Sequence, residues 1–323
     1  MLPLDRRSVS LLGLAALLSP RALAQEAYPS RPIRLIIGFP PGAASDICGR
    51  IFAEHAAPIL GQQFVPENKP GAGSSIAAQY VARAAPDGYT LFVPALSSLT
   101  NELANPSPNF DMSKDLAPVA LLANLAIVLV VSPASNVRSI SDLIALAKSK
   151  PGQVLYASVG AGSLPHLCGV MFAQRAEIDL VHIPYQGSPQ GLMDVVAGRI
   201  TMMFAPASGI IGQVAAGKLV ALATAADKRP VALPDVPTMA EAGMPDFDTS
   251  LWLGLLAPAR TPRPILDKLA DAAHKAMHAP AAVETLRKQG YEPLEAGPDE
   301  FAAVIESEIT RWSVVARSAT SNQ

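Results

Sequence analysis

Short apolar runs alternate with helical patterns along most of the chain. The first run, 33–39, leads through Pro40-Pro41-Gly42 into a segment, 43–60, whose apolar residues recur at helical spacing. Further strand-like runs lie at 63–66, 89–94, 127–131, 154–159, 180–184, 200–204, 219–223 and 251–256. Helical patterns lie between most of them, at 74–84, 139–148, 163–175, 189–197 and 210–216, and three mostly helical stretches close the chain. This alternation predicts an α/β fold with largely parallel sheets.

The first 24 residues have the pattern of an export signal. Arg6-Arg7 precede an apolar run, 9–18, that is too short to span a bilayer, and Ala22 and Ala24 fit a cleavage site. We therefore predict a removed signal peptide, residues 1–24, and a periplasmic location for the remaining chain. The paired arginines leave both the general secretory route and the twin-arginine route open.

The composition narrows the class of partner. The chain has a net charge of −2, only 16% of its residues are charged, and its 25 basic residues are scattered. We expect no binding to nucleic acid, because that requires concentrated positive charge. Two cysteines, Cys48 and Cys168, are too few for a disulfide scaffold, and we expect both to be small buried side chains.

The sequence indicates no cofactor and no metal site. Gly71-Ala72-Gly73-Ser74-Ser75-Ile76 lacks the last glycine of a dinucleotide-binding fingerprint, and no phosphate-binding P-loop motif occurs. His274 and His278 lie four residues apart in a helical stretch, but no acidic residue lies between them. We therefore expect a solvated helix face there instead of a zinc site.

The segment from Phe39 to Asp46 joins a buried strand directly to a helix. Free backbone N–H groups at a helix start bind an anion without any cationic side chain, and Gly42 lets a ligand approach the backbone closely. The alternative is an ordinary turn that the prolines stiffen, and the spacing alone favours neither interpretation. The Asp46 carboxylate either accepts a hydrogen bond from a ligand or favours the helix start electrostatically, and we favour the second role.

A second segment, 158–166, repeats the order of strand, glycine-rich loop and helix start. Ser163 and His166 lie three residues apart there, so they share a face of the predicted helix. They could bond a ligand or act as nucleophile and base, but Ser163 is more simply an N-cap. No third residue that would orient the histidine is evident, and no G-x-S-x-G motif occurs.

The order and spacing of several motifs resemble the Bug family of extracytoplasmic solute receptors, the binding components of tripartite tricarboxylate transporters. The resemblance covers nearly the whole chain after the predicted signal peptide. It rests on the motifs at 28–33, 39–42, 67–73, 86–91, 156–158, 162–166, 183–185, 216–219 and 233–238.

The resemblance implies a type II periplasmic binding fold, in which two lobes joined by two crossing strands enclose a ligand cleft. The crossings would fall near 125–131 and 250–256, which gives one lobe of 25–125 with 250–323 and another of 126–249. Carried over by motif, the ligand-binding residues would be Phe39, Gly42, Ala43, Ala44 and Asp46 on one side, Ser163, His166, Tyr185 and Gly187 on the other, and Ala95, Ser97 and Ala205 as further wall residues. Ala43 stands where the family usually has a second glycine, so the approach to the backbone would be narrower.

These observations predict a monomeric binding protein, not an enzyme, that captures a small carboxylate-bearing metabolite. The ligand would be a di- or tricarboxylate, an amino acid or an aromatic acid, and the partners would be the membrane subunits of a tripartite transporter. Two alternatives stay open: a receptor that signals to a membrane kinase, and a hydrolase that uses Ser163 and His166.

Overall fold

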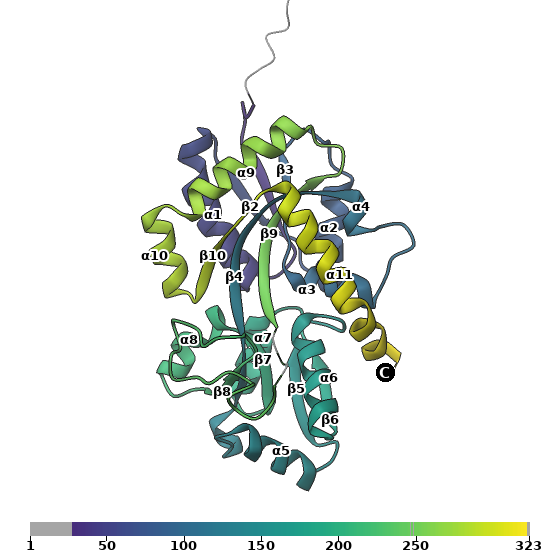
Figure 1. Ribbon diagram of the computed structural model, residues 1–323, viewed down its shortest axis with the longest axis vertical. Coiled ribbons are helices and arrows are strands. Elements are labelled where there is room, and N and C mark those ends of the chain that lie inside the picture. Colours follow the sequence, from purple (N-terminus) through teal and green to yellow (C-terminus); the bar gives the residue numbers. More distant parts are fainter. Residues whose placement is uncertain (1–27, 246, 248, 322–323) are drawn as a thin grey trace, which may run out of the picture.

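The computed structural model describes residues 28–245, 247 and 249–321, so the predicted signal peptide lies outside the described residues. Figure 1 shows two lobes, one above the other, with two long strands running between them. We call them the upper lobe and the lower lobe. None of the helices in the described part of the chain combines the length and the hydropathy that a membrane span requires.

The upper lobe is built on a mixed sheet with helices on its faces. Its strands follow the order β2 (Phe64–Asn68), β1 (Ile33–Ile37), β3 (Thr90–Val93), β9 (Ser250–Pro258) and β4 (Leu116–Val131), and β10 (Tyr291–Ala296) also pairs with β4. β1 is parallel to β2 and β3, whereas β9 is antiparallel to β3 and β4. The helices are α1 (Ala44–Leu60), α2 (Ser75–Ala82), α3 (Leu96–Ala104), α4 (Met112–Asp115), α9 (Arg263–Met277), α10 (Pro280–Lys288) and α11 (Pro298–Ser321).

The lower lobe has a second sheet that begins where the first one ends. Its strands are the last part of β4 together with β5 (Val154–Ser158), β6 (Leu180–Pro184), β7 (Met202–Pro206) and β8 (Val220–Thr224). Its helices are α5 (Ile140–Ser149), α6 (Leu164–Ala176), α7 (Ser188–Val196) and α8 (Ala207–Ala215).

β4 connects the two sheets because it changes partners along its length. It pairs with β9 as far as Ala126, opposite Ser250, and from Ile127 onward it pairs with β7 and β8. The segment from Leu121 to Val131 is almost wholly buried, as expected of a strand covered on both faces. This apolar run is therefore part of a single strand, β4, that both lobes share.

Several elements differ from the sequence prediction, among them α4, which was not predicted, and β4, which begins at Leu116 instead of residue 127. β10 lies within a stretch predicted to be mostly helical, and α3 was not predicted. α8 begins at Ala207, three residues before the predicted start, directly after Pro206. The last helix, α11, packs against α3 and β4 of the upper lobe, so the C-terminal end of the chain returns onto elements that come much earlier in the sequence.

Candidate functional site

A small cavity lies between the lobes where five helices begin. Its walls are Phe39, Ala43, Ala44, Ser45, Ala95 and Ser97 from the upper lobe, Val159, Pro165, Ser188 and Pro206 from the lower lobe, and Leu251 of β9. These residues include the first turns or N-caps of α1, α3, α6, α7 and α8. None of the described residues that line the cavity is charged.

The cavity walls present hydrogen-bond donors without positive side chains. The N–H groups of Ala44 and Ser45, in the first turn of α1, donate to no partner in the described part of the chain. Ser45 is 1% exposed, and its buried hydroxyl also has no partner there. Unpaired donors and the positive ends of helix dipoles favour an anion at this point. Ser45 was not selected from the sequence, although its place in the first turn after Pro-Pro-Gly could have indicated it.

We call the segment from Phe39 to Asp46 the first loop, and its conformation is held by Asp46. Asp46 accepts hydrogen bonds from the Gly42 N–H at 2.9 Å, from Arg50 Nε at 2.9 Å and from Asn68 Nδ2 at 2.9 Å. Asn68 also donates to the Phe39 carbonyl at 2.9 Å. Burial raises the pKa of Asp46, but these hydrogen bonds outweigh it and hold the pKa below its ordinary value. The carboxylate does not line the cavity, so its observed role is to hold the loop, with Gly42 at a φ of 80°.

Ser163 and His166 do not form a nucleophile–base pair. The Ser163 hydroxyl donates to the Gly160 carbonyl at 2.6 Å, and His166 Nδ1 accepts from the Gly162 N–H at 3.1 Å. The His166 ring packs against Tyr156 and, with a centroid distance of 4.2 Å, against His182. Burial lowers the pKa of His166 to about 4, which keeps the ring neutral near pH 7.

His166 faces away from the cavity between the lobes. It lines a separate hollow of about 330 Å³ in the lower lobe, which α6, β5 and β6 enclose. Ser163 is fully buried at the start of α6 and also lies outside the cavity lining. In this structure both side chains therefore support the second loop, residues 158–166, without lining the cavity.

The remaining predicted residues lie around the cleft in different ways. Ala43, Ala44, Ala95, Ser97 and Phe39 line the cavity directly. Tyr185 lies at one mouth of the cleft, where its hydroxyl donates to Asp194 at 2.5 Å. Ala205 is buried in β7 opposite Val128, one residue before Pro206, which does line the cavity.

Gly187 lies where the two lobes come close together. It precedes α7, and a Cβ atom built on it would lie 2.7 Å from Pro40 Cδ in the upper lobe. Asn101 and Asn105 of the upper lobe donate across the cleft to the Ala161 carbonyl, at 2.6 and 3.2 Å. These two asparagines were not selected from the sequence, because only the tertiary fold brings α3 to the second loop.

Two larger hollows flank the cavity. One, of about 410 Å³, has mostly apolar walls from the first loop, α7 and α8, with Gln213 and Lys218 at its border. The other, of about 570 Å³, lies on the side of Asn101, Asn105 and Tyr185. The central cavity itself measures only about 20 Å³, which is room for about one water molecule. A ligand with several carbon atoms must part the lobes or extend into a hollow.

Comparison with known proteins places this geometry in a family. The family model for the tripartite tricarboxylate transporter family receptor matches residues 48–320. Protein BugT of Bordetella pertussis is 35% identical over 314 residues, which cover 96% of this chain and 94% of BugT. MatC of Rhodopseudomonas palustris, solved with bound malate, is 31% identical with a TM-score of 0.84, and the match covers 90% of this chain and all of MatC.

A second solved structure from R. palustris, a protein with adipate, gives the same picture. It is 31% identical with a TM-score of 0.87, and the match covers 90% of this chain and 98% of that protein. These likenesses confirm the predicted two-lobed α/β binding fold. The chain therefore belongs to the family of tripartite tricarboxylate transporter receptors, which are periplasmic solute-binding proteins.

Proposed function

We propose that the protein captures a small carboxylate-bearing metabolite in the periplasm and delivers it to the membrane subunits of a tripartite tricarboxylate transporter. The observation that carries this proposal is the convergence of five helix N-termini on a cavity whose described wall residues carry no charge. The malate and adipate in the two similar structures support a carboxylate as the ligand class.

The ligand carboxylate would replace its water with neutral donors of the first loop. The N–H groups of Ala44 and Ser45 and the Ser45 hydroxyl supply three donors on one side, and the start of α7 faces them from the other lobe. Neutral donors suit a receptor that must also exist empty, because an unpaired buried cation would be costly without its ligand. Asp46, Ser163 and His166 would contribute by holding the two loops in place.

Ligand release would require the lobes to separate. We propose that 25–125 with 250–323 moves as one body relative to 126–249, with the hinge where β4 changes partners after Ala126. The contacts of Asn101 and Asn105 with the Ala161 carbonyl join the lobes at the cleft, so they would break on opening. A ligand that contacts both lobes binds the closed form better and shifts the population toward it.

The test is a ligand panel on the purified product of the full chain. Thermal stability is measured with mono-, di- and tricarboxylates, amino acids and aromatic acids, because a ligand at 100 times its dissociation constant adds about 2.7 kcal/mol. We expect a clear shift with one or a few acids, which remain chemically unchanged after incubation. No shift with any acid would overturn the carboxylate proposal, and turnover of an acid would overturn the binding role.

A pair of serine variants tests the site itself. Ser45→Ala removes a buried hydroxyl from a residue that lines the cavity. Ser74→Ala removes a buried hydroxyl that likewise has no partner among the described residues but belongs to a residue outside the cavity lining. A hydrogen bond to a charged group contributes about 1.5–3 kcal/mol, so Ser45→Ala should weaken acid binding roughly 10- to 100-fold. Ser74→Ala should leave the affinity unchanged. Equal effects of the two substitutions in calorimetry would contradict the assigned contact.

A further inference from the structure

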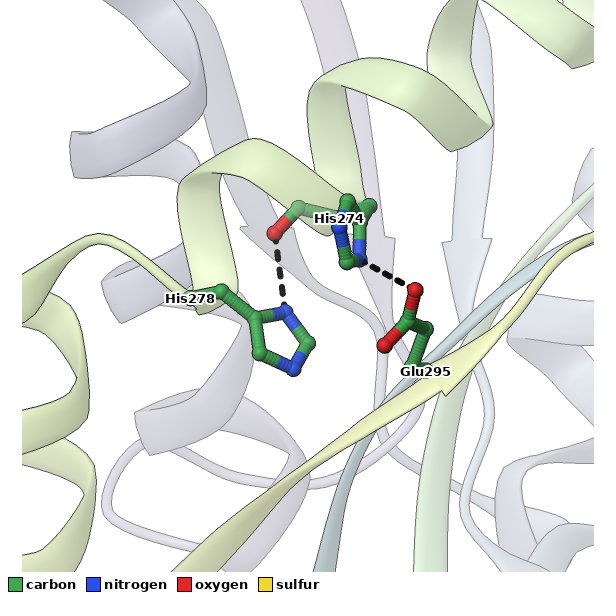
Figure 2. Close-up of side chains that lie close together, drawn as sticks. All are labelled: His274, His278 and Glu295. Atoms are coloured by element: carbon green, nitrogen blue, oxygen red, sulfur yellow. Dashed lines mark hydrogen bonds and ion pairs between the residues drawn. The ribbon is translucent and has the colours of Figure 1, made fainter.

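Two exposed histidines and a glutamate meet on the outer surface of the upper lobe. His274 and His278 lie one turn apart at the end of α9, and Glu295 reaches them from β10 (Figure 2). His274 Nδ1 lies 3.6 Å from Glu295 Oε1, and the two imidazole centroids are 4.6 Å apart. Within the described part of the chain, this is the one place where three potential metal-ligating side chains gather.

The three side chains present the donors that zinc prefers. One nitrogen from each histidine and one carboxylate oxygen all lie within 4.8 Å of one another. Catalytic and surface zinc sites commonly take three protein ligands of this kind at about 2.0–2.2 Å, with water in the fourth position. In a tetrahedral shell of that size the donors are about 3.3 Å apart. Because all three side chains are exposed, small rotations close the difference without disturbing the core.

A hydrogen bond already fixes the tautomer of one ligand. His278 Nδ1 lies 3.0 Å from the His274 carbonyl oxygen, and a carbonyl oxygen can only accept. Nδ1 therefore carries the proton, and the Nε2 lone pair remains available to a cation. This arrangement, in which the second ring nitrogen donates to a carbonyl, is the usual support of a histidine ligand. The neighbouring cation, Lys275, is neutralised by Asp271 at 2.7 Å.

We propose that His274, His278 and Glu295 bind a zinc ion on the upper lobe, at a site separate from the ligand cleft. This departs from the solvated helix face expected from the sequence, because the acidic residue comes from β10 and not from between the histidines. None of the three residues lines the cavity or either flanking hollow. The bound ion would join α9 to β10, the strand whose Tyr291 hydroxyl donates to the Ala44 carbonyl at 2.8 Å. The site thus ties the surface of the upper lobe to the strand that supports the first loop. The proposal does not depend on the identity of the cleft ligand.

Zinc titration of the purified protein tests this site. The full chain is expressed without a histidine tag, treated with a chelator, and titrated with zinc sulfate by calorimetry, with magnesium and calcium chloride as controls. We expect one saturable zinc site and a rise in melting temperature with zinc. Magnesium and calcium should give neither, because these cations prefer all-oxygen ligand sets. A titration in which zinc shows no saturable binding would overturn the proposal.

Single variants locate the ion. His274→Ala, His278→Ala and Glu295→Gln should each weaken zinc binding at least tenfold, because each removes one of three protein ligands. All three positions are exposed, so the variants should keep the circular dichroism spectrum of the parent protein. His55→Ala, which removes an imidazole from α1, is the matched control and should bind zinc as the parent does. If the double variant of His274 and His278 retains the parent affinity, the ion lies elsewhere and the assignment is wrong.

Discussion

The close approach of the two lobes at Gly187 allows a direct test of lobe closure. In the structure, a Cβ atom on Gly187 would lie 2.7 Å from Pro40 Cδ and 2.9 Å from Pro40 Cγ. Ordinary contacts of such atoms are near 3.5–4.0 Å, so Gly187→Ala forces the lobes about 1 Å apart at this point. The φ of Gly187 is −170°, which any residue adopts. The substitution therefore leaves the lower lobe unstrained by itself.

The size of the effect follows from where the clash occurs. Overpacking a close contact by one methyl group costs about 1–3 kcal/mol, and here only the closed form carries that cost. A ligand that binds through closure would lose affinity by the same amount, which corresponds to roughly 5- to 150-fold. Calorimetry with the acid that gives the largest thermal shift measures this loss. The melting temperature without ligand should change little if the empty protein is mainly open.

Two further variants separate closure from a general defect. Gly212→Ala places a methyl group in α8 of the same lobe, where nothing lies within 4 Å, and it should bind like the parent protein. Pro40→Ala in the Gly187→Ala background removes the ring that the new methyl group meets, so the double variant should recover most of the lost affinity. If Gly187→Ala binds the acid as tightly as the parent, or if Pro40→Ala restores nothing, the proposed closure of the lobes is wrong.

Two other outcomes follow from the site. Lys218→Met should weaken binding of long dicarboxylates about two- to fivefold but leave binding of monocarboxylates unaffected. The reason is that the exposed Lys218 ammonium at the flanking hollow can reach only a second, distant carboxylate of the ligand. Calorimetry with dicarboxylates of increasing chain length checks this. The unfolded chain takes up a proton on His166 as the pH falls through 6.5, whereas the folded protein does so only near pH 4. As the pH falls from 6.5 to 4, His166 should therefore lower the free energy of unfolding by up to about 3 kcal/mol. In urea unfolding, the free energy of unfolding of His166→Gln should depend less steeply on pH than that of the parent protein.

The architecture was predictable because its signals are local. Each strand and helix of a repeating α/β unit has its own periodicity, and the two cleft loops stand out through Pro40-Pro41-Gly42 and through the glycines before Ser163. The convergence of five helices was not predictable in this way. α3 lacks a strong start signal, since Ala95 is its N-cap, and β10 includes Pro293, which weakens its strand pattern. Where such elements meet depends on the pairing of distant strands.

The roles of individual residues show why a motif indicates a class of ligand more readily than a particular one. Asp46 stands in the most distinctive loop, and its partner Asn68 arrives from β2 because β1 and β2 pair in register, with Ile37 opposite Asn68. That pairing brings Asn68 to the Asp46 carboxylate. The N–H groups of Ala44 and Ser45, which have no partner in the described part of the chain, lie at the cavity. Backbone donors are the same in every sequence, so they favour an anion without choosing among acids. We therefore expect the selective groups to be those that border the flanking hollows, such as Lys218 and Asn101, which lie far from the motif in sequence. Changes in specificity within this fold should therefore concentrate at the hollows and leave the first loop unaltered.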